Sequence, residues 1–283
     1  MADFTATASF RDAVRGVDGI IHVASPFTYD TSNNEEELVK PAIAGVKAVL
    51  QAAEQENKEG GKVKRVVITS SFAAVLDAGR KAPPRFTYTA ADWNPLSYEE
   101  AVSSETSAVV AYRGSKKFAE LAAWEFVKEH NPSFDIVTLC PPMTFGPVAH
   151  PVESLEKLNE SNAMLWRVAS GKELPVARVP FWVDVRDLAG AHVEALFRAE
   201  AGGKRFVVAS PEKFSYGIVK DIVKSDFPWG EGRVAEGEQA VEDSYDLDGE
   251  TAGRELGVGY KSFRETVRDF VEQAVKMEEK EKR

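Results

Sequence analysis

The stretch VKRVVITSS, residues 63–71, decides the fold because it combines a buried strand with a polar end. Residues 66–68 are three adjacent β-branched residues, and such unbroken apolar runs are typical of strands in parallel sheets covered on both faces. Three further runs of this kind predict strands, namely GIIHVA (19–24), DIVTLC (135–140) and RFVVA (205–209).

Longer stretches with helical periodicity separate these runs, at residues 36–54, 109–129, 154–170 and 185–199. The first contains Pro41, which a helix tolerates only in its first turn, so we expect that helix to begin near residue 39 or 40. Strands alternating with helices indicate an α/β fold with a doubly wound parallel sheet. From about residue 141 onward, we expect a smaller lobe.

Composition excludes several classes of partner. The formal net charge of −10 disfavours nucleic acid, because like charges repel the phosphate backbone. No apolar run approaches the length of a membrane span, and MADFTATASF is not a signal peptide, so we expect no membrane segment. The single cysteine, Cys140, favours a reducing, cytoplasmic location. The four histidines show no spacing typical of a metal site, so we expect no metal.

Two long irregular segments, residues 76–102 and 141–152, directly follow predicted strands. Loops of this length in a compact domain are usually functional. Open α/β sheets also bind ligands at the carboxyl ends of their strands. We therefore expect the functional site at this edge of the sheet.

Tyr112 and Lys116 have the spacing Y-x-x-x-K on a predicted helix, which stacks them on one face. At an effective dielectric constant of ~20 and a separation of ~4 Å, an ammonium group attracts a phenolate by roughly 4 kcal/mol. As an upper bound, this attraction moves a tyrosine pKa from about 10 toward ~7, where the phenol can exchange protons with a carbonyl or alcohol. The alternative is a half-buried aromatic residue beside a lysine that reaches the surface.

Ser71 adds a third polar group, because it ends the strand at 63–69 and lies 41 residues before Tyr112. A serine in this place can hold a substrate carbonyl beside the tyrosine. The combination of strand end, long loop and helix is much rarer than Y-x-x-x-K alone.

Five stretches together resemble the extended short-chain dehydrogenase/reductases of the NAD-dependent epimerase/dehydratase superfamily. Within that family the chain is most similar to the dihydroflavonol and cinnamoyl-CoA reductases, and especially to the fungal NADPH-dependent aldehyde and ketone reductases of the methylglyoxal type. The stretches are VDGIIHVASPF (17–27), VKRVVITSSFAAV (63–75), AYRGSKKFAELAAWEF (111–126), LCPPMTFGP (139–147) and VPFWVDVRDLAGAHVEAL (179–196).

The resemblance implies a Rossmann-type cofactor domain over residues 1–140. Residues 141–283 would mainly form a substrate-binding lobe, with about 181–209 returning to the sheet. It also implies that Ser71 orients the carbonyl, Tyr112 donates the proton, and Lys116 lowers the tyrosine pKa and holds the nicotinamide ribose. The implied cofactor contacts beyond Tyr112 and Lys116 are Asp3, Phe4, Ala24, Ser25, Pro26, Pro141, Pro142, Met143 and Thr144.

The resemblance is incomplete at the N-terminus, because the family's G-x-x-G-x-x-G turn is not found in the sequence. That turn lets the backbone approach the pyrophosphate of the cofactor. We expect the chain to be N-terminally truncated by roughly 60–70 residues, about two strand-helix units and a strand. The strand at 19–24 would then be an exposed apolar edge, and NADP(H) binding would be weak or absent.

The predicted function is NADPH-dependent reduction of an aldehyde or ketone, impaired in this chain. The partner is a small-molecule carbonyl substrate, and the chain is expected to be a monomer or homodimer. The alternatives are a non-catalytic remnant or interaction protein, and a nucleotide-sugar epimerase or dehydratase. Candidate pocket-wall residues, each of which could equally belong to the core, are Phe27, Phe72, Phe86 and Trp182.

Three further residues have a structural interpretation. His22, in a predicted buried strand, is interpreted as a hydrogen-bonded core residue. Cys140 is interpreted as a small core residue and not as a nucleophile. Asp184 is expected to join the lobe to the sheet.

Overall fold

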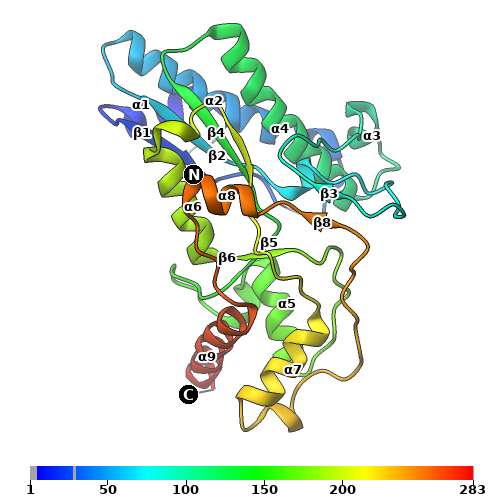
Figure 1. Cartoon of the computed structure of the whole chain (residues 1–283). Coiled ribbons are helices and arrows are strands. Elements are labelled where there is room, and N and C mark those ends of the chain that lie inside the picture. Colours follow the sequence, from blue (N-terminus) through cyan, green and yellow to red (C-terminus); the bar gives the residue numbers. More distant parts are fainter. Residues whose placement is uncertain (1–4, 28–29, 283) are drawn as a thin grey trace.

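The main sheet has four parallel strands in the order β1-β2-β4-β7. The structure, a computed structural model, describes residues 5–27 and 30–282 (Figure 1). β2 (Arg65–Thr69) and β4 (Asp135–Cys140) lie in the middle, between β1 (Gly19–His22) and β7 (Arg205–Val207). Each sequence-predicted strand is therefore present, and the doubly wound, Rossmann-type α/β class is confirmed.

One face of this sheet is covered by two long helices, α2 (Lys40–Lys58) and α4 (Ala108–His130). They share a buried core with Val66 and Ile68 of β2. α2 begins at Lys40, as the position of Pro41 predicts, and a short π-helical turn, η2 (Glu35–Val39), precedes it.

The other face is covered by α6 (Val185–Phe197) and α8 (Glu250–Leu256). Val67 of β2 points into this second core, because successive side chains of a strand point to opposite faces. Burial of β2 and β4 on both faces explains why their sequences carry unbroken apolar runs.

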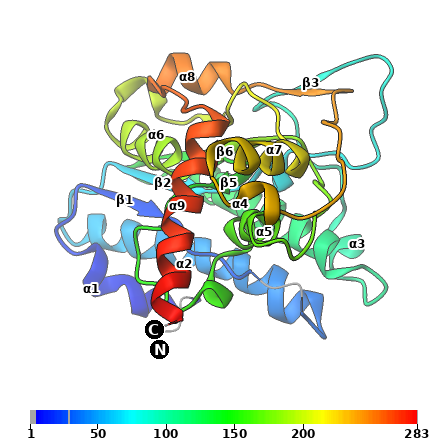
Figure 2. The same ribbon diagram turned by 90° about the horizontal axis from the view of Figure 1, so that it is seen from below.

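A separate core lies beside the main sheet, around the two-stranded parallel sheet of β5 (Met143–Phe145) and β6 (Trp182–Asp184). Figure 2 shows helices gathered beside it. They are α5 (Glu160–Ala169), α7 (Tyr216–Asp226) and α9 (Phe263–Glu281). The division of the chain at residue 140 stays a prediction, although β7 follows β6 and α6 back into the main sheet.

Asp184 links the two parts, as expected for a structural role. Its fully buried carboxylate accepts hydrogen bonds from the backbone N–H of Arg186 (2.7 Å) and from Oγ1 of Thr266 on α9 (2.6 Å). The first bond caps the N-terminus of α6, and the second fixes α9 to the same point.

The segment 76–102, predicted to be irregular, contains two short elements. β3 (Thr87–Tyr88) pairs with β8 (Asp246–Leu247), and α3 (Tyr98–Val102) begins with a capping box. The prediction was wrong here because a two-residue strand and a five-residue helix are too short to show periodicity. The remaining short elements are η1 (Thr7–Phe10), α1 (Arg11–Val14), η3 (Phe72–Ala74), η4 (Leu155–Lys157), η5 (Ala199–Ala201) and η6 (Gly230–Gly232).

A loop follows η3, and its neck is closed by Tyr88. The Tyr88 hydroxyl donates to the carbonyl of Asp77 (2.8 Å) and accepts from the backbone N–H of Asp77 (3.1 Å). The guanidinium of Arg205 donates to the carbonyls of Ala74 (3.4 Å) and Ala90 (2.9 Å), which flank the neck. Both ends of the loop are therefore fixed to the sheet.

β1 forms an edge of the main sheet within the residues that the structure describes. Ile21 and the following Val23 are 39% and 60% exposed, which agrees with the expected apolar edge. None of the helices in the described part of the chain is both long and apolar enough to cross a membrane.

Candidate active site

The carboxyl ends of β1, β2 and β4 meet at one edge of the sheet, because the three strands run parallel. Hydrogen bonds join the chain there: the backbone N–H of Ser70 donates to the carbonyl of Leu139 (2.8 Å), and that of Phe72 to the carbonyl of Pro141 (2.8 Å). Ser71 therefore lies beside the start of the segment after β4.

Ser71 caps the short helix η3, its Oγ accepting from the backbone N–H of Ala73 (3.1 Å). That bond uses a lone pair of the oxygen, so the O–H can still donate to a carbonyl. η3 packs against α4, the helix that carries the tyrosine and the lysine.

Tyr112 and Lys116 lie one turn apart on α4, and both are half-buried. The Lys116 Nζ is 5.8 Å from the centre of the Tyr112 ring, and the Phe27 ring meets that ring edge-on at 5.1 Å. Burial lowers the pKa of Lys116 to about 8. This placement favours the inward-facing interpretation over a lysine on the surface.

His22 ends β1 and is only 7% exposed. Its burial agrees with the interpretation as a core residue, whereas its Nε2 has no hydrogen-bond partner in the described part of the chain. Burial, followed by the charge of Lys116, lowers the pKa of His22 to about 4. At neutral pH this edge therefore holds a neutral imidazole near an ammonium group.

Glu120, which the sequence reasoning missed, is the centre of a buried polar network on α4. It is 1% exposed, and its carboxylate accepts two hydrogen bonds from Arg205, to Oε1 at 2.8 Å and Oε2 at 3.1 Å. The hydroxyls of Ser70 and Thr138 each donate to it at 2.6 Å. The missed signal was the continued spacing of four residues, from Tyr112 to Lys116 to Glu120, on one helix face.

Cys140 is fully buried, which agrees with its interpretation as a core residue. Its Sγ lies 3.5 Å from Oε2 of Glu120. Burial and then the Glu120 charge raise the pKa of the thiol well above its usual range, so a thiolate nucleophile is disfavoured.

The predicted cofactor contacts follow the carboxyl ends of two strands. After β1, Ala24 is exposed while Ser25 and Pro26 are half-buried. After β4, Pro141 is buried, and three half-buried residues follow it: Pro142, Met143 and Thr144. Asp3 and Phe4 lie outside the described residues.

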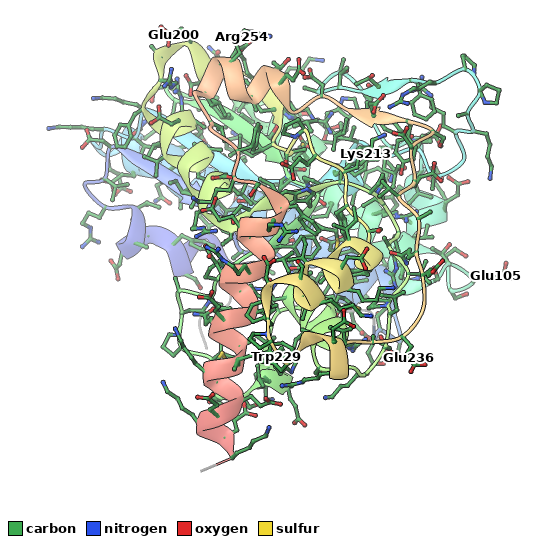
Figure 3. The ribbon with its side chains drawn as sticks, turned by 60° about the horizontal axis from the view of Figure 1, so that its bottom comes forward. Glu105, Glu200, Lys213, Trp229, Glu236 and Arg254 are labelled. Carbon is green, nitrogen blue, oxygen red and sulfur yellow. The ribbon has the colours of Figure 1, made fainter. Side chains whose placement is uncertain are left out.

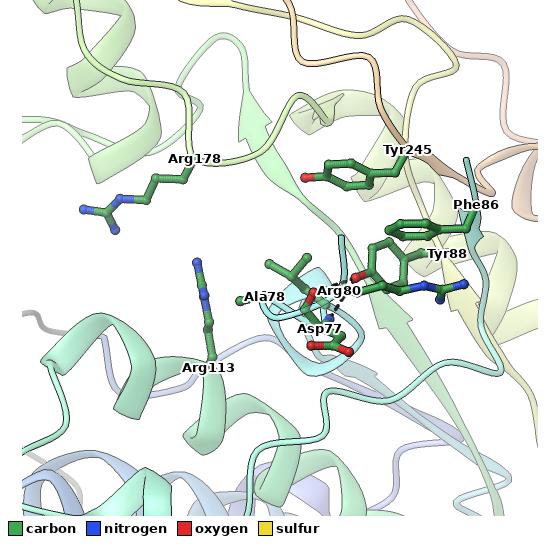
Figure 4. Close-up of a pocket in the computed structure, with 9 residues that line it drawn as sticks. Asp77, Ala78, Arg80, Phe86, Tyr88, Arg113, Arg178 and Tyr245 are labelled. Carbon is green, nitrogen blue, oxygen red and sulfur yellow. Dashed lines mark hydrogen bonds between the residues drawn. The ribbon is translucent and has the colours of Figure 1, made fainter. Parts of the chain in front are cut away.

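Of the predicted pocket-wall residues, Phe86 lines a cavity of about 260 Å³ above the loop after η3 (Figure 4). Phe27 is 50% exposed beside Tyr112. The structure places the other two in cores instead: Phe72 packs edge-on against Tyr88 at 5.5 Å, and Trp182 is fully buried. An apolar aromatic residue in the sequence carries no signal that separates these two environments.

The residues at this edge fit the nicotinamide end of a dinucleotide. Lys116 offers an ammonium group for ribose hydroxyls, and the segments after β1 and β4 offer apolar and backbone surfaces. Nearby, the Ser71 O–H can hold the substrate. Ser71 and Tyr112 are carried by η3 and α4, two elements that pack against each other.

Comparison with known proteins agrees with this geometry. The sequence model of the NAD dependent epimerase/dehydratase family matches residues 1–209. An uncharacterized oxidoreductase of Schizosaccharomyces pombe is 36% identical over 280 residues, which are 98% of this chain and 81% of that protein. The NADPH-dependent methylglyoxal reductase GRE2 of Saccharomyces cerevisiae is 34% identical over 271 residues, which are 92% of this chain and 77% of that protein.

A solved structure shows the same similarity. The crystal structure of yeast methylglyoxal/isovaleraldehyde reductase Gre2 complexed with NADPH matches with a TM-score of 0.85 and 30% identity, over 98% of this chain and 83% of that chain. Family and relatives together cover most of the sequence, so the chain belongs to the NAD dependent epimerase/dehydratase family, within its extended short-chain dehydrogenase/reductase group.

Proposed function

We propose that this chain is an NADPH-dependent carbonyl reductase that converts an aldehyde or ketone to an alcohol. The observation that carries the proposal is the half-buried Lys116 beside Tyr112, with Ser71 at the adjoining strand end. Relatives named as an NADPH-dependent methylglyoxal reductase and as a ketoreductase, the second from Aspergillus niger, support the reaction class. Epimerisation of a nucleotide sugar is less well supported, because these relatives are reductases.

In the proposed reaction the Ser71 hydroxyl donates a hydrogen bond to the carbonyl oxygen and so fixes its position. NADPH, when bound, supplies the hydride that the carbonyl carbon accepts. Tyr112 donates its phenolic proton to the oxygen, so that one hydride and one proton give the alcohol. The Lys116 ammonium stabilises the phenolate that remains on Tyr112.

Replacement of the tyrosine tests the proposal directly. We expect Tyr112→Phe to lower kcat for reduction of methylglyoxal about 10²- to 10⁴-fold, the usual contribution of a positioned acid. Tyr98→Phe is the matched control. The Tyr98 hydroxyl donates a hydrogen bond to Glu35 (3.0 Å), and this pair lies away from the strand ends. NADPH oxidation, followed at 340 nm, measures both. Equal rates for Tyr112→Phe and the unaltered chain would refute the assignment.

The affinity of this 283-residue chain for NADPH is proposed to be weak. Support comes from its sequence, which holds no G-x-x-G-x-x-G turn to receive the pyrophosphate. Fluorescence titration should give a dissociation constant in the micromolar range or above, and a nanomolar value would contradict the proposal. Light scattering after size-exclusion chromatography measures the molar mass and so tests the proposal that the chain is a monomer or homodimer.

A further inference from the structure

The cavity of about 260 Å³ that contains Phe86 is lined by an unusual set of side chains. Figure 4 shows aromatic rings on one side and two arginines on the other, with Arg113 rising from α4 toward the loop of Arg178. The Tyr245 hydroxyl points toward the space between them. The lining residues that matter here are Arg80, Arg113, Arg178, Phe86, Tyr88 and Tyr245.

The charge of this lining is opposite to that of the whole molecule. Among the residues that the structure describes, three arginines and a single carboxylate, that of Asp77, line the cavity of a chain whose formal net charge is −10. The Asp77 carboxylate accepts a hydrogen bond from the backbone N–H of Gly79 at 2.8 Å, within its own loop. A cationic recess in an acidic protein concentrates anions locally.

The aromatic side of the cavity is rigid. Phe86 and Tyr245 are stacked at 5.6 Å, and the Arg80 guanidinium lies 3.7 Å above the Phe86 ring. Lys213 (labelled in Figure 3) fixes Tyr245, which directly precedes β8, because its Nζ donates to the Tyr245 carbonyl at 2.6 Å. Arg80 thus belongs to the wall, whereas Arg113 and Arg178 form the opposite side.

Apart from the Asp77 carboxylate, the polar side chains around the cavity can donate hydrogen bonds. Burial raises the pKa of Tyr245 to about 12, so its hydroxyl stays protonated. Each guanidinium carries five N–H donors. When some of these donors bond to a partner within the protein, the remaining donors can still bind a ligand. Guanidinium forks match the two oxygens of a carboxylate or phosphate.

The cavity shares two structural elements with the proposed catalytic residues. Arg113 directly follows Tyr112 on α4. Leu76, on the cavity wall, closes the turn that Ser71 begins, since its backbone N–H donates to the carbonyl of Phe72 at 2.9 Å. Elements that carry the proposed catalytic residues, α4 and the turn after Ser71, therefore also contribute to the wall of the cavity.

We propose that Arg113 and Arg178 bind an anionic group, a carboxylate or a phosphate, on the carbonyl substrate, while the aromatic wall holds its body. That the anionic group belongs to a substrate rests on the proposed function, but the anion can bind at the two arginines without turnover. The carbonyl compound would thus be an acid, such as an aromatic aldehyde bearing a carboxylate.

Binding without cofactor provides the first test. Isothermal titration with benzoate, phenyl phosphate and neutral benzamide compares the same ring with different head groups. We expect at least one anion to bind about tenfold or more tightly than benzamide, and Arg113→Gln and Arg178→Gln each to remove about tenfold of that affinity. Which anion binds identifies carboxylate or phosphate. Equal affinity for benzamide and both anions would overturn the proposal.

Two variants serve as controls. Arg254→Gln on α8 removes an exposed arginine that does not line the cavity and should leave benzoate affinity unchanged. Arg113→Lys keeps the charge and should restore part of the affinity lost in Arg113→Gln. Far-UV circular dichroism checks that each variant is folded. An equal loss of affinity in Arg254→Gln would point to general charge and contradict the site.

Turnover separates this inference from the proposed function. The ratio of kcat/KM for 4-carboxybenzaldehyde to that for 4-carbamoylbenzaldehyde should exceed about ten and fall toward one in Arg178→Gln. If benzoate binds through the arginines but neither aldehyde is reduced with saturating NADPH, the proposed function fails and the anion site stands. If both aldehydes are reduced equally and no anion binds, the anion site fails alone.

Discussion

Replacing the buried carboxylate of Glu120 should destabilise the protein more than any surface change. Glu120→Gln keeps the shape of the side chain but removes its charge. The side chain of Arg205, which is 8% exposed, keeps its positive charge. The new amide offers two N–H donors to a site whose other members, Arg205 and the hydroxyls of Ser70 and Thr138, also donate. At least one donor then has no acceptor.

The magnitude follows from the number of bonds affected. The carboxylate accepts two guanidinium and two hydroxyl hydrogen bonds, and its loss leaves a buried cation uncompensated. Breaking a buried pair from one side costs about 3–5 kcal/mol. We therefore expect Glu120→Gln to lower the free energy of unfolding by about 3–5 kcal/mol.

Urea-induced unfolding, followed by tryptophan fluorescence at pH 7, measures this change. The matched control is Glu194→Gln, which breaks the exposed pair with Arg198 (2.6 Å) and should cost under about 0.5 kcal/mol. A double variant, Glu120→Leu with Arg205→Met, should be more stable than Glu120→Leu alone, because no charge is left buried. A loss below about 1 kcal/mol for Glu120→Gln would refute the reasoning.

Three other predictions use the same assay. Gly171→Ala should lower the free energy of unfolding more than Gly203→Ala. Both glycines have positive φ (78° and 71°), but of the two only Gly171 has a backbone atom, the Arg233 carbonyl oxygen, where the new Cβ would lie. Equal losses of stability would contradict this reasoning. The pKa of His22, lowered to about 4, predicts that stability falls by up to ~3 kcal/mol as pH drops from about 6.5 through 4, since only the unfolded imidazole readily takes a proton. His22→Gln should remove that component, and parallel pH curves would count against it. The pKa of Lys116, lowered to about 8, predicts that stability rises between about pH 8 and 10.5, because the unfolded state binds more protons there. Lys116→Met should abolish this rise, and an unchanged slope would contradict the assignment.

The sequence predicted the main sheet well because its signals are local. β4 has the predicted bounds, and the unbroken apolar runs reflect burial on both faces. The pairing of β5 with β6 could not be predicted, since each has three residues and their partners lie about forty positions apart. α9 carries Phe263, Val267 and Phe270 on its buried face, so its helical period was present in the sequence but not used.

The candidate site, like the fold, could be predicted from the sequence only in part. Tyr112 and Lys116 are four residues apart, so one helix brings them together and spacing alone suggests their chemistry. The anion site is formed by Arg113, Arg178 and Tyr245, which only the tertiary fold brings near one another. Within the residues that the structure describes, His22 Nε2 has no hydrogen-bond partner, and this could not be predicted because apolar neighbours in a strand do not reveal what faces an imidazole nitrogen.

The neck that Tyr88 closes on Asp77 makes the segment between them an Ω-loop, which ion pairs from Arg85 to Asp243 and Asp246 also tie to the rest of the chain. Its anchors, at Ala74 and Ala90, are backbone carbonyls and so do not depend on which side chains the tip carries. Tip residues can therefore be exchanged, inserted or deleted at little thermodynamic expense to the sheet below. Because Arg80 and Phe86 belong to this loop, transplanting the loop between relatives would be a direct route to new substrate preferences on an unchanged catalytic scaffold.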